Sequence, residues 1–269
     1  MEQGSANESV RHPHGQVTTV VVDDHVLVMT VDRVERKNAF TPKIVTELAE
    51  AYTRLDEDPS LFVGVLSFAG EHTTAGLEMP LFFGPDGSMD LPDAAVDPYG
   101  LGRRLRKPLV TAVQGITFTI GIEIALAGDV IVASSDSRFC QMEPKRGLAP
   151  LGGATIRYVQ RAGWGNAMYH LLRADEFDAA EALRIGLVQE VVEPGTQIDR
   201  AIAIAKEMTS CGPIALQHTI ANARRALEEN EPAAIAAIPS MAAAVLATED
   251  FQEGIASFLE RRPAVFKGY

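Results

Sequence analysis

The stretch from Leu109 to Gly153 reads LVTAVQGITFTIGIEIALAGDVIVASSDSRFCQMEPKRGLAPLGG and predicts two buried strands separated by an apolar helix. Short apolar runs bounded by turn residues are typical of buried strands. The expected elements are a strand at residues 110–113, a turn at 115–119, a helix at 121–127 and a second strand at 130–133. Glu123 therefore falls in the first turn of a helix that is otherwise apolar.

A carboxylate in such surroundings needs either a hydrogen-bonding neighbour or a use for its charge. Taken alone, Glu123 fits two interpretations, a complement to the positive end of the helix dipole and a catalytic group. Glu143 follows the second strand on the loop at residues 139–144. If the two strands are parallel neighbours, both carboxylates reach the same edge of the sheet and face one cavity.

Four blocks of sequence resemble the crotonase family, also called the enoyl-CoA hydratase/isomerase family. They read RVERKNAF at residues 33–40, TAGLE at 74–78, the segment 114–129, and EGIASFLERRPAVFKG at 253–268. Each block is weak by itself, but four in the same order are specific. The resemblance covers nearly all of the chain beyond its N-terminal tail.

The resemblance implies an α/β fold, a spiral of repeated β-β-α units followed by a C-terminal helical region that builds a trimer, commonly paired into a hexamer. Composition alone indicates only a mixed α/β domain of enzyme size. The expected division is a flexible tail at residues 1–16, a spiral core with the acyl-CoA site at 17–196, and a helical region at 197–269 that trimerises and covers CoA.

The family implies a site that binds an acyl-CoA thioester and stabilises its enolate oxygen with two backbone amides. In this sequence those amides are the N–H groups of Leu77 and Ile120. The family usually has three consecutive glycines before the catalytic helix, where this chain reads Thr119-Ile120-Gly121. A β-carbon at Ile120 is tolerable only if the backbone there does not require glycine.

Both positions that carry glutamate in the hydratases are glutamate here. By this analogy Glu123 activates water and Glu143 protonates the α-carbon of the substrate. Two carboxylates in one small apolar site cannot both ionise easily, so the pair is expected to share its proton uptake. The resemblance further implies contacts with CoA or substrate at Arg36, Lys37, Ala39, Ala75, Gly76 and Lys267.

The resulting functional prediction is an enoyl-CoA hydratase that acts on a trans-2-enoyl-CoA thioester, a lyase of fatty acid metabolism such as beta-oxidation. Coenzyme A is expected as part of the substrate, with no permanently bound cofactor and no metal. Two alternatives stay open, an enoyl-CoA isomerase that shuttles a proton with one carboxylate, and an acyl-CoA binding protein with little turnover.

Charge and composition limit the classes of partner that we expect for this protein. The formal net charge of -12 argues against a general nucleic-acid or membrane surface, so a polyanionic ligand must meet local cations. The two cysteines, Cys140 and Cys211, form no Cys-x-x-Cys pair, and the six histidines show no metal-ligand spacing. Residues 1–16 lack an apolar signal segment, and a cytoplasmic location is expected.

Several local signals predict further elements. Residues 17–31 suggest a hairpin that turns at Asp23-Asp24-His25. Thr41 and Pro42 suggest the start of a helix with an apolar stripe, and Asp178 with Glu181 suggests a capping box. The segment 79–102 is expected to form a mobile lid. The basic residues Arg103, Arg104, Arg106 and Lys107 are expected to form a solvated face, with a phosphate clamp as the alternative.

Overall fold

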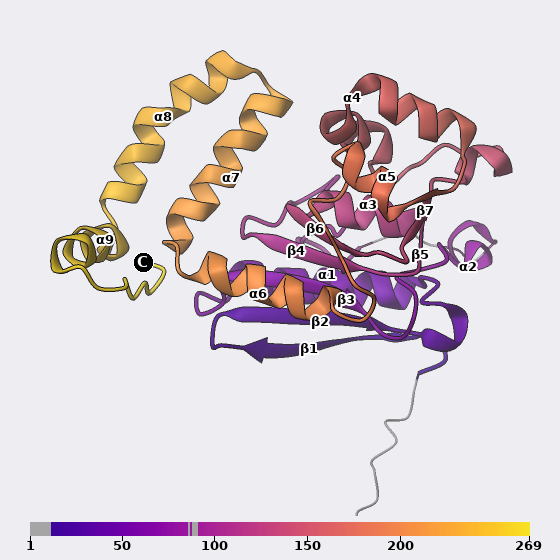
Figure 1. Ribbon diagram of the computed structural model, residues 1–269, viewed down its shortest axis with the longest axis horizontal. Coiled ribbons are helices and arrows are strands. Elements are labelled where there is room, and N and C mark those ends of the chain that lie inside the picture. Colours follow the sequence, from indigo (N-terminus) through magenta and orange to yellow (C-terminus); the bar gives the residue numbers. More distant parts are fainter. Residues whose placement is uncertain (1–11, 86, 88–90) are drawn as a thin grey trace, which may run out of the picture.

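A six-stranded sheet forms the centre of the molecule, and its strands follow the order β1-β2-β3-β4-β6-β9 (Figure 1). The computed structural model describes residues 12–85, 87 and 91–269. β1 runs antiparallel to β2, and the later neighbours run parallel, so helical crossovers connect them. The strands are β1 (Gln16–Val22), β2 (Val26–Asp32), β3 (Val63–Phe68), β4 (Leu109–Val113), β6 (Val130–Ser134) and β9 (Glu190–Val192).

A smaller sheet has three strands in the order β5-β7-β8. These are β5 (Ile116–Phe118), β7 (Arg138–Cys140) and β8 (Phe177–Asp178). The turn predicted at residues 115–119 is therefore wrong, because residues 116–118 pair in parallel with β7. A three-residue strand shows too little alternation to be recognised, and its partner is distant in the sequence.

The hairpin predicted at residues 17–31 is confirmed as β1 and β2. Val22 and Val26 close the ladder, and the turn between them places Asp23 at φ 52° and Asp24 at φ 62°. Two successive positive φ angles suit the right-handed twist of the strands, and aspartate is among the residues that tolerate them.

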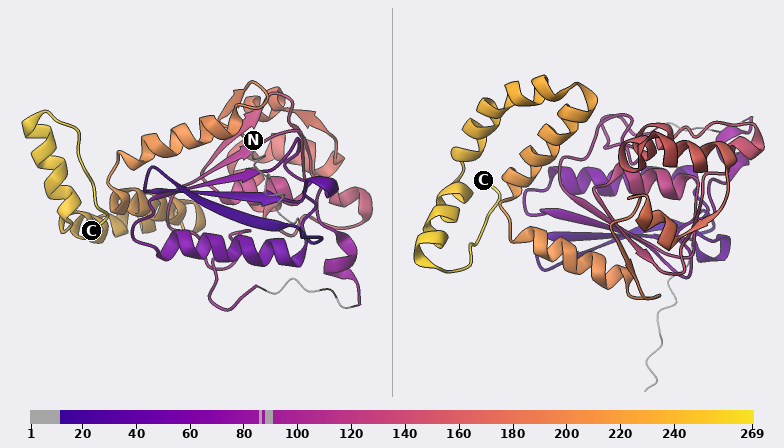
Figure 2. Two further views of the ribbon diagram at one scale, coloured as in Figure 1. Left: turned by 90° about the horizontal axis from the view of Figure 1, so that it is seen from below. Right: turned by 45° about the horizontal axis from the view of Figure 1, so that its top comes forward.

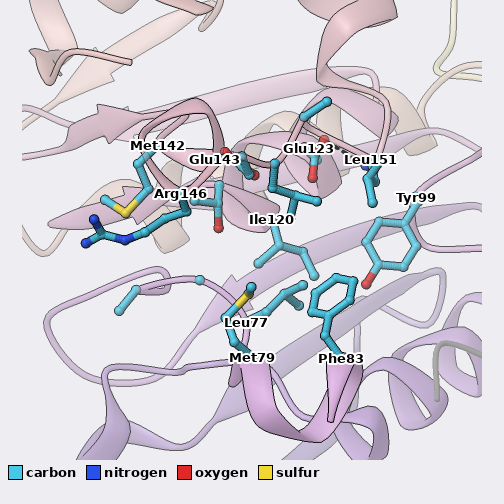
Figure 3. A pocket seen from close by; sticks show the side chains of 16 residues that line it. Leu77, Met79, Phe83, Tyr99, Ile120, Glu123, Met142, Glu143, Arg146 and Leu151 are labelled. Carbon is cyan, nitrogen blue, oxygen red and sulfur yellow. Dashed lines mark hydrogen bonds between the residues drawn. The ribbon is translucent and has the colours of Figure 1, made fainter. Parts of the chain in front are cut away.

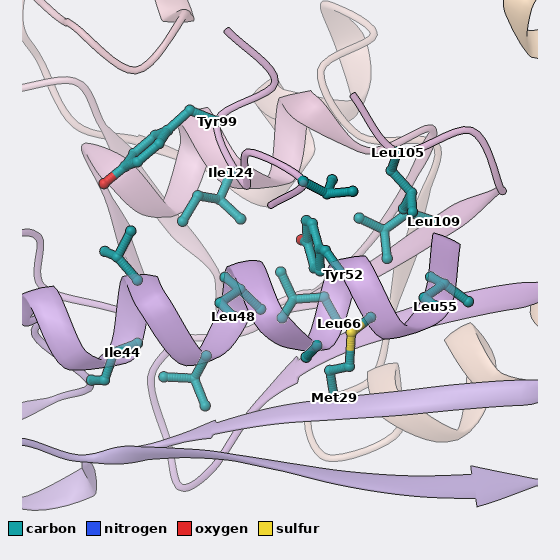
Figure 4. Packing of buried hydrophobic residues seen from close by; sticks show 14 of the residues in the cluster. Met29, Ile44, Leu48, Tyr52, Leu55, Leu66, Tyr99, Leu105, Leu109 and Ile124 are labelled. Atoms are coloured by element: carbon teal, nitrogen blue, oxygen red, sulfur yellow. The ribbon is translucent and has the colours of Figure 1, made fainter. Parts of the chain in front are cut away.

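Helix α1 (Pro42–Glu57) begins as predicted at Thr41. The Thr41 hydroxyl oxygen accepts the N–H of Ile44 at 3.2 Å, and Pro42 occupies the first turn, where its missing N–H costs nothing. The predicted apolar stripe is buried against the sheet, and Figure 4 shows Leu48, Tyr52 and Leu55 packed with Met29 and Leu66. This stripe anchors α1 by burial of apolar surface.

The central strands confirm the arrangement on which the candidate site depends. β4 and β6 are parallel neighbours, with Val110 opposite Val130. Helix α3 (Ile120–Ala127) lies between β4 and β6 in the sequence. It begins one residue earlier than predicted and is buried along nearly its whole length. The carboxyl ends of the two strands therefore meet at one edge, as expected.

Beyond α3 the chain is mainly helical. Only half of the predicted capping box forms at helix α5 (Ala179–Arg184). The Asp178 carboxylate accepts the N–H of Glu181 at 2.9 Å, whereas the Glu181 carboxylate pairs with Arg184 and His170 instead of the Asp178 N–H. Helix α4 contains a kink at Gly163, whose φ of 73° is outside the helical range. The later helices are α4 (Ala154–Arg173), α6 (Gln197–Thr209), α7 (Pro213–Glu228), α8 (Glu231–Leu246) and α9 (Glu249–Glu260).

The first helix of the predicted C-terminal region at residues 197–269 packs on the large sheet. α6 lies on the large sheet, where Ala201, Ile204 and Ala205 are buried against β3, β4 and β6. Helices α7, α8 and α9 instead project from the body of the molecule (Figures 1 and 2). The sheet covers the apolar face of α6, so α6 belongs structurally to the core.

The projecting helices carry exposed apolar side chains. Phe258 is 82% exposed and Leu259 is 73% exposed, and both belong to α9. In the part of the chain that the structure describes, no single helix has the length and apolar composition needed to cross a bilayer. The α8 and α9 pair meets those criteria only jointly, across a bend of 74°.

Part of the predicted N-terminal tail is held in place. Most of residues 1–16 lie outside the described residues, but the carbonyl of His14 accepts the Thr41 hydroxyl at 2.7 Å. The carbonyl of Pro13 accepts Arg33 Nε at 3.2 Å, and Gln16 is already part of β1. The end of the tail is therefore tied to the start of α1 by backbone acceptors.

The basic run is only in part the predicted solvated face, because Arg103 and Arg106 are exposed and Lys107 is buried, and the alternative of a phosphate clamp stays a prediction. Arg103 and Arg106 both bind the buried carboxylate of Asp56, at 2.9 Å and 3.0 Å, and the N–H of Arg106 also donates to it. Lys107 is buried and donates to the carbonyl of Asp58 at 2.6 Å. These contacts hold the segment before β4 against the C-terminal end of α1.

Replacing Asp56 by asparagine is expected to lower the free energy of unfolding by about 2 kcal/mol, because hydrogen bonds to a buried charge are lost. The matched control is Glu57→Gln, whose carboxylate pairs with Arg103 at 3.0 Å on the surface. Its effect should stay below about 1 kcal/mol. Urea denaturation followed by circular dichroism measures both, and equal effects would contradict the assignment.

Candidate active site

An elongated cavity of about 210 Å³ lies where three segments meet, namely the loop and short helix α2 (Met79–Phe83) after β3, the start of α3, and the 3-10 turn η2 (Glu143–Arg146) after β7. In Figure 3, Glu123 and Glu143 lie on the opposite side of the cavity from Met79 and Phe83. Most of the other lining side chains are apolar, and they include Leu77, Ile120, Met142, Leu148 and Leu151.

Glu123 is a buried carboxylate with two backbone donors. Its side chain is in the first turn of α3, the residue is 4% exposed, and its Oε1 accepts the N–H of Gly152 at 2.8 Å and of Ala154 at 3.2 Å. Burial raises the pKa of Glu123, and these two bonds and the Arg157 charge oppose that rise. Both backbone donors use Oε1, which leaves Oε2 available to another partner.

Gly152 permits this close approach. A β-carbon at that position would lie 2.5 Å from Glu123 Oε2 and 2.9 Å from Tyr99 Cδ1, and both distances are too short for real contacts. The backbone of residues 152–154 can therefore reach the carboxylate only because residue 152 has no side chain.

Glu143 is the second carboxylate of the cavity. Its Oε1 accepts Gln141 Nε2 at 2.9 Å, whereas its buried Oε2 has no partner among the described residues. Burial, with the nearby charge of Glu123, raises the pKa of Glu143 to about 7. The structure thus brings the two glutamates to one cavity, as the sequence predicted, and gives them different environments.

Two backbone N–H groups at the same cavity lack acceptors. The loop after β3 pairs with Phe40 through the carbonyl of Gly76 and the N–H of Glu78, so the N–H of Leu77 is left over. Ile120 is the first residue of α3, where an N–H has no intrahelical partner. Neither N–H donates to any acceptor in the described part of the chain, and both residues line the cavity.

The backbone at Ile120 does not require glycine. The residue with positive φ is its neighbour Thr119, at φ 50° and ψ −113°. Ile120 is the first residue of α3 and has no positive φ, so its β-carbon causes no backbone strain there. Of the two residues that replace glycines of the family pattern, only Thr119 has a strained backbone conformation.

Five of the residues predicted to contact CoA lie on two adjacent loops. The N–H of Ala75 donates to the carbonyl of Lys37 at 3.0 Å. Ala75 and Gly76 line the cavity, whereas the side chain of Lys37 is exposed beside it. Arg36 is exposed on the same turn as Lys37, and Ala39 connects that turn to Phe40.

Lys267 does not lie in the cavity of its own chain. The N–H groups of Lys267 and Gly268 donate to the Asp250 carboxylate of α9 at 2.7 Å and 2.8 Å. Gly268 approaches Phe62, which precedes β3, whereas Leu77 follows β3. The C-terminal tail is therefore at the opposite end of the sheet from the cavity.

The segment predicted as a lid, residues 79–102, is partly fixed. Asp97 accepts the N–H groups of Tyr99, Leu101 and Gly102 at 2.7 to 2.9 Å, and Val96 is buried. Residues 86 and 88–90 lie outside the described residues. The carboxylate of Asp97 holds the second half of the segment in a turn. The mobility of the lid stays a prediction.

Sequence reasoning missed Tyr99 and Arg146 as lining residues. The Tyr99 hydroxyl is buried without a partner among the described residues, and burial raises its pKa. Tyr99 lies on an irregular segment and Arg146 ends the short 3-10 turn η2, and neither segment is long enough for periodicity to indicate which way a side chain points. Within residues 12–85, 87 and 91–269, no three histidine, cysteine, aspartate or glutamate side chains gather in a way that could hold a metal ion.

Comparison with known proteins gives a consistent result. The family model described as enoyl-CoA hydratase/isomerase matches residues 22–269. The enoyl-CoA hydratase EchA19 of Mycobacterium tuberculosis is 30% identical over 250 residues, which cover 90% of this chain and 93% of that protein. The (E)-benzylidenesuccinyl-CoA hydratase of Thauera aromatica is 34% identical over 266 residues, covering 93% and 98%.

Solved structures agree. A probable enoyl-CoA hydratase/isomerase from Mycobacterium abscessus superposes with a TM-score of 0.90 at 39% identity, covering 95% of this chain and 99% of that one. An enoyl-CoA hydratase from Mycobacterium tuberculosis gives a TM-score of 0.87 at 32% identity, covering 96% and 100%. This chain therefore has the crotonase fold and belongs to the enoyl-CoA hydratase/isomerase family.

Proposed function

We propose that this protein adds water across the double bond of a trans-2-enoyl-CoA thioester. The observation that carries the proposal is the pair of glutamates at one apolar cavity that Leu77 and Ile120 also line, with no acceptor for the N–H groups of these two residues in the described part of the chain. Hydration needs a base for the water, an acid for the α-carbon and donors for the thioester oxygen, and this cavity contains candidates for each. The hydratase relatives support the same reaction type.

The two glutamates divide the proton transfers. Glu123 is fixed through Oε1, so its Oε2 can accept a proton from the attacking water. Glu143 has a pKa raised to about 7, so near neutral pH a substantial fraction carries the proton that the α-carbon needs. Because the two charges interact, the pair titrates as a unit and its apparent pKa values belong to both residues.

The N–H groups of Leu77 and Ile120 are proposed to bind the thioester oxygen. Charge develops on this oxygen as the nucleophile adds to the β-carbon, and fixed donors stabilise it without reorganisation. Ile120 adds the positive end of the α3 dipole. The apolar lining excludes competing water and strengthens both interactions.

The loops at residues 36–39 and 75–76 are proposed to hold the CoA part of the substrate. Ala75 and Gly76 line the cavity, and Ala39 directly precedes Phe40, whose backbone pairs with that of Leu77. Arg36 and Lys37 provide exposed cations next to the cavity. Paired cations suit phosphate, and they are needed in a chain of net charge -12.

A trimer or a hexamer is proposed as the working assembly. An apolar groove of about 490 Å³ lies between α7 and α9, and it is lined by Ile214, Phe251 and Phe258 among others. Exposed apolar surface of this kind favours association. Lys267 is far from its own cavity, so its proposed contact with CoA requires the tail of a neighbouring copy.

Incubation with a panel of enoyl-CoA thioesters tests the function. Loss of the conjugated absorbance with a hydroxyacyl product supports hydration. A product with a shifted double bond would identify an isomerase, and tight binding without turnover would identify a binding protein.

Glu123→Gln and Glu143→Gln are each expected to lower kcat for hydration by at least about 100-fold, because each removes one proton transfer. The dissociation constant of a saturated acyl-CoA should change little, because the amide keeps the shape of the side chain. Glu176→Gln is the control, since Glu176 pairs with Arg138 on the surface away from the cavity. Either cavity variant with wild-type kcat would refute the role given to that residue.

The pH dependence follows from the raised pKa of Glu143. Folding stability associated with protonated Glu143 is fully present below about 4.5, and it is lost as pH rises toward about 7. Glu143→Gln cannot ionise, so its melting temperature relative to wild type should be higher at pH 8 than at pH 5. In wild type, kcat should fall above about pH 7 as the acid loses its proton. A Tm difference independent of pH would contradict the assignment.

Lys267→Ala is expected to raise KM for an enoyl-CoA with little change in kcat, because the lysine meets the nucleotide of a substrate bound to a neighbouring copy. The effect should weaken at high salt and vanish with a pantetheine thioester that lacks the nucleotide. Lys206→Ala, another partly exposed lysine, serves as the control. Equal loss with both substrates would mean that Lys267 acts through folding or assembly.

A further inference from the structure

Thr119 has an unfavourable backbone conformation directly beside the candidate oxygen site. Its φ of 50° and ψ of −113° lie in a region that residues with a β-carbon seldom adopt. Glycine would adopt these angles without a steric cost. Such strained residues persist where the surrounding structure holds them, and they cluster at functional sites.

The Thr119 hydroxyl does not perform the task usual for its position. Thr119 is the N-cap residue of α3, yet its side chain caps no helix N–H. Thr41 and Thr248 occupy the same position on α1 and α9, and each accepts a backbone N–H with its hydroxyl oxygen. The hydroxyl of Thr119 is thus not used to cap the helix that it begins.

The hydroxyl instead occupies space next to the other donor loop. A β-carbon built on Gly76 would lie 2.8 Å from Thr119 Oγ1, so the absence of a side chain at Gly76 makes room for this oxygen. Thr119 lines the cavity with Leu77 and Ile120, the two residues whose N–H groups lack acceptors. In the described part of the chain, Thr119 Oγ1 forms no hydrogen bond.

We propose that the Thr119 hydroxyl is a third donor to the thioester oxygen, acting with the N–H groups of Leu77 and Ile120. This inference rests on the proposed function of the cavity. The hydroxyl donates its proton in a hydrogen bond and keeps it, so no covalent bond to Thr119 forms or breaks. The bond strengthens as negative charge builds on the oxygen, and it therefore stabilises the transition state more than the bound substrate.

Three substitutions separate the hydroxyl from the strain. Thr119→Val keeps the shape and removes the donor, whereas Thr119→Ser keeps the donor. Thr119→Gly removes the donor and the strain together. Thr196→Val, which removes an exposed threonine hydroxyl bonded to the Glu193 carbonyl, is the control.

Thr119→Val should lower kcat for hydration of crotonyl-CoA by at least about tenfold, with the dissociation constant of butanoyl-CoA within about twofold of wild type. Thr119→Ser should keep kcat within about threefold, and the control should match wild type. Thr119→Gly should lose as much kcat as Thr119→Val while its melting temperature is equal to or above that of wild type. Wild-type kcat in Thr119→Val, or a loss confined to KM, overturns the proposal.

A second readout does not depend on turnover. Hydrogen bonds to a thioester oxygen move the ¹³C resonance of its carbonyl downfield, so bound butanoyl-CoA labelled at that carbon reports the donors directly. The downfield shift should be smaller in Thr119→Val than in wild type and preserved in Thr119→Ser. If wild type binds the label with this pattern but hydrates no enoyl-CoA, the donor role stands and the proposed function falls. Equal shifts in wild type and Thr119→Val overturn the donor role.

Discussion

The burial of Glu123 against an apolar cavity is the constraint on which the site depends. A carboxylate taken out of water is expensive unless it is hydrogen-bonded, and here two backbone N–H groups from residues 152–154 meet one of its oxygens. That bond pair fixes the loop before α4 over the start of α3. It also requires Gly152, because any side chain there would collide with the carboxylate.

The same cavity leaves several polar groups without partners among the described residues. Glu143 Oε2, the Tyr99 hydroxyl and the N–H groups of Leu77 and Ile120 have no acceptor or donor within the described residues. Buried polar groups are normally paired, and exceptions call for an explanation. A ligand that supplies a carbonyl oxygen and reactive carbons satisfies several of them at once, which is what a thioester substrate offers.

The C-terminal helices and the tail lie away from the cavity of their own chain (Figure 1). α6 packs on the sheet, whereas α7 to α9 extend outward and leave Phe258 and Leu259 largely exposed. The tail is folded back on α9 through Asp250, which places Lys267 at the far end of its own sheet. The arrangement gives a physical reason to look for part of the CoA site on another copy of the chain.

Local chemistry determined much of the fold from the sequence alone. The caps at Thr41 and Asp178, the hairpin turn at Asp23 and Asp24, and the strands β4 and β6 were all predictable, because each depends on neighbouring residues or on a strong apolar pattern. The parallel pairing of β4 with β6 was only a condition of the predicted site, and the structure meets it. The apolar surroundings already singled out the two glutamates, and the resemblance to the family added their proposed roles and the two backbone donors. The structure confirmed that all four line one cavity.

Only the tertiary structure decided the remaining features, because they depend on contacts between segments distant in sequence. The strand β5 exists through its pairing with β7, and the basic residues Arg103 and Arg106 are used by a carboxylate on α1. Tyr99 enters the cavity from an irregular loop that Asp97 holds. The positive φ of Thr119 and the direction of its hydroxyl follow from the way α3 meets the loop at Gly76, and no pattern in the sequence encodes that meeting.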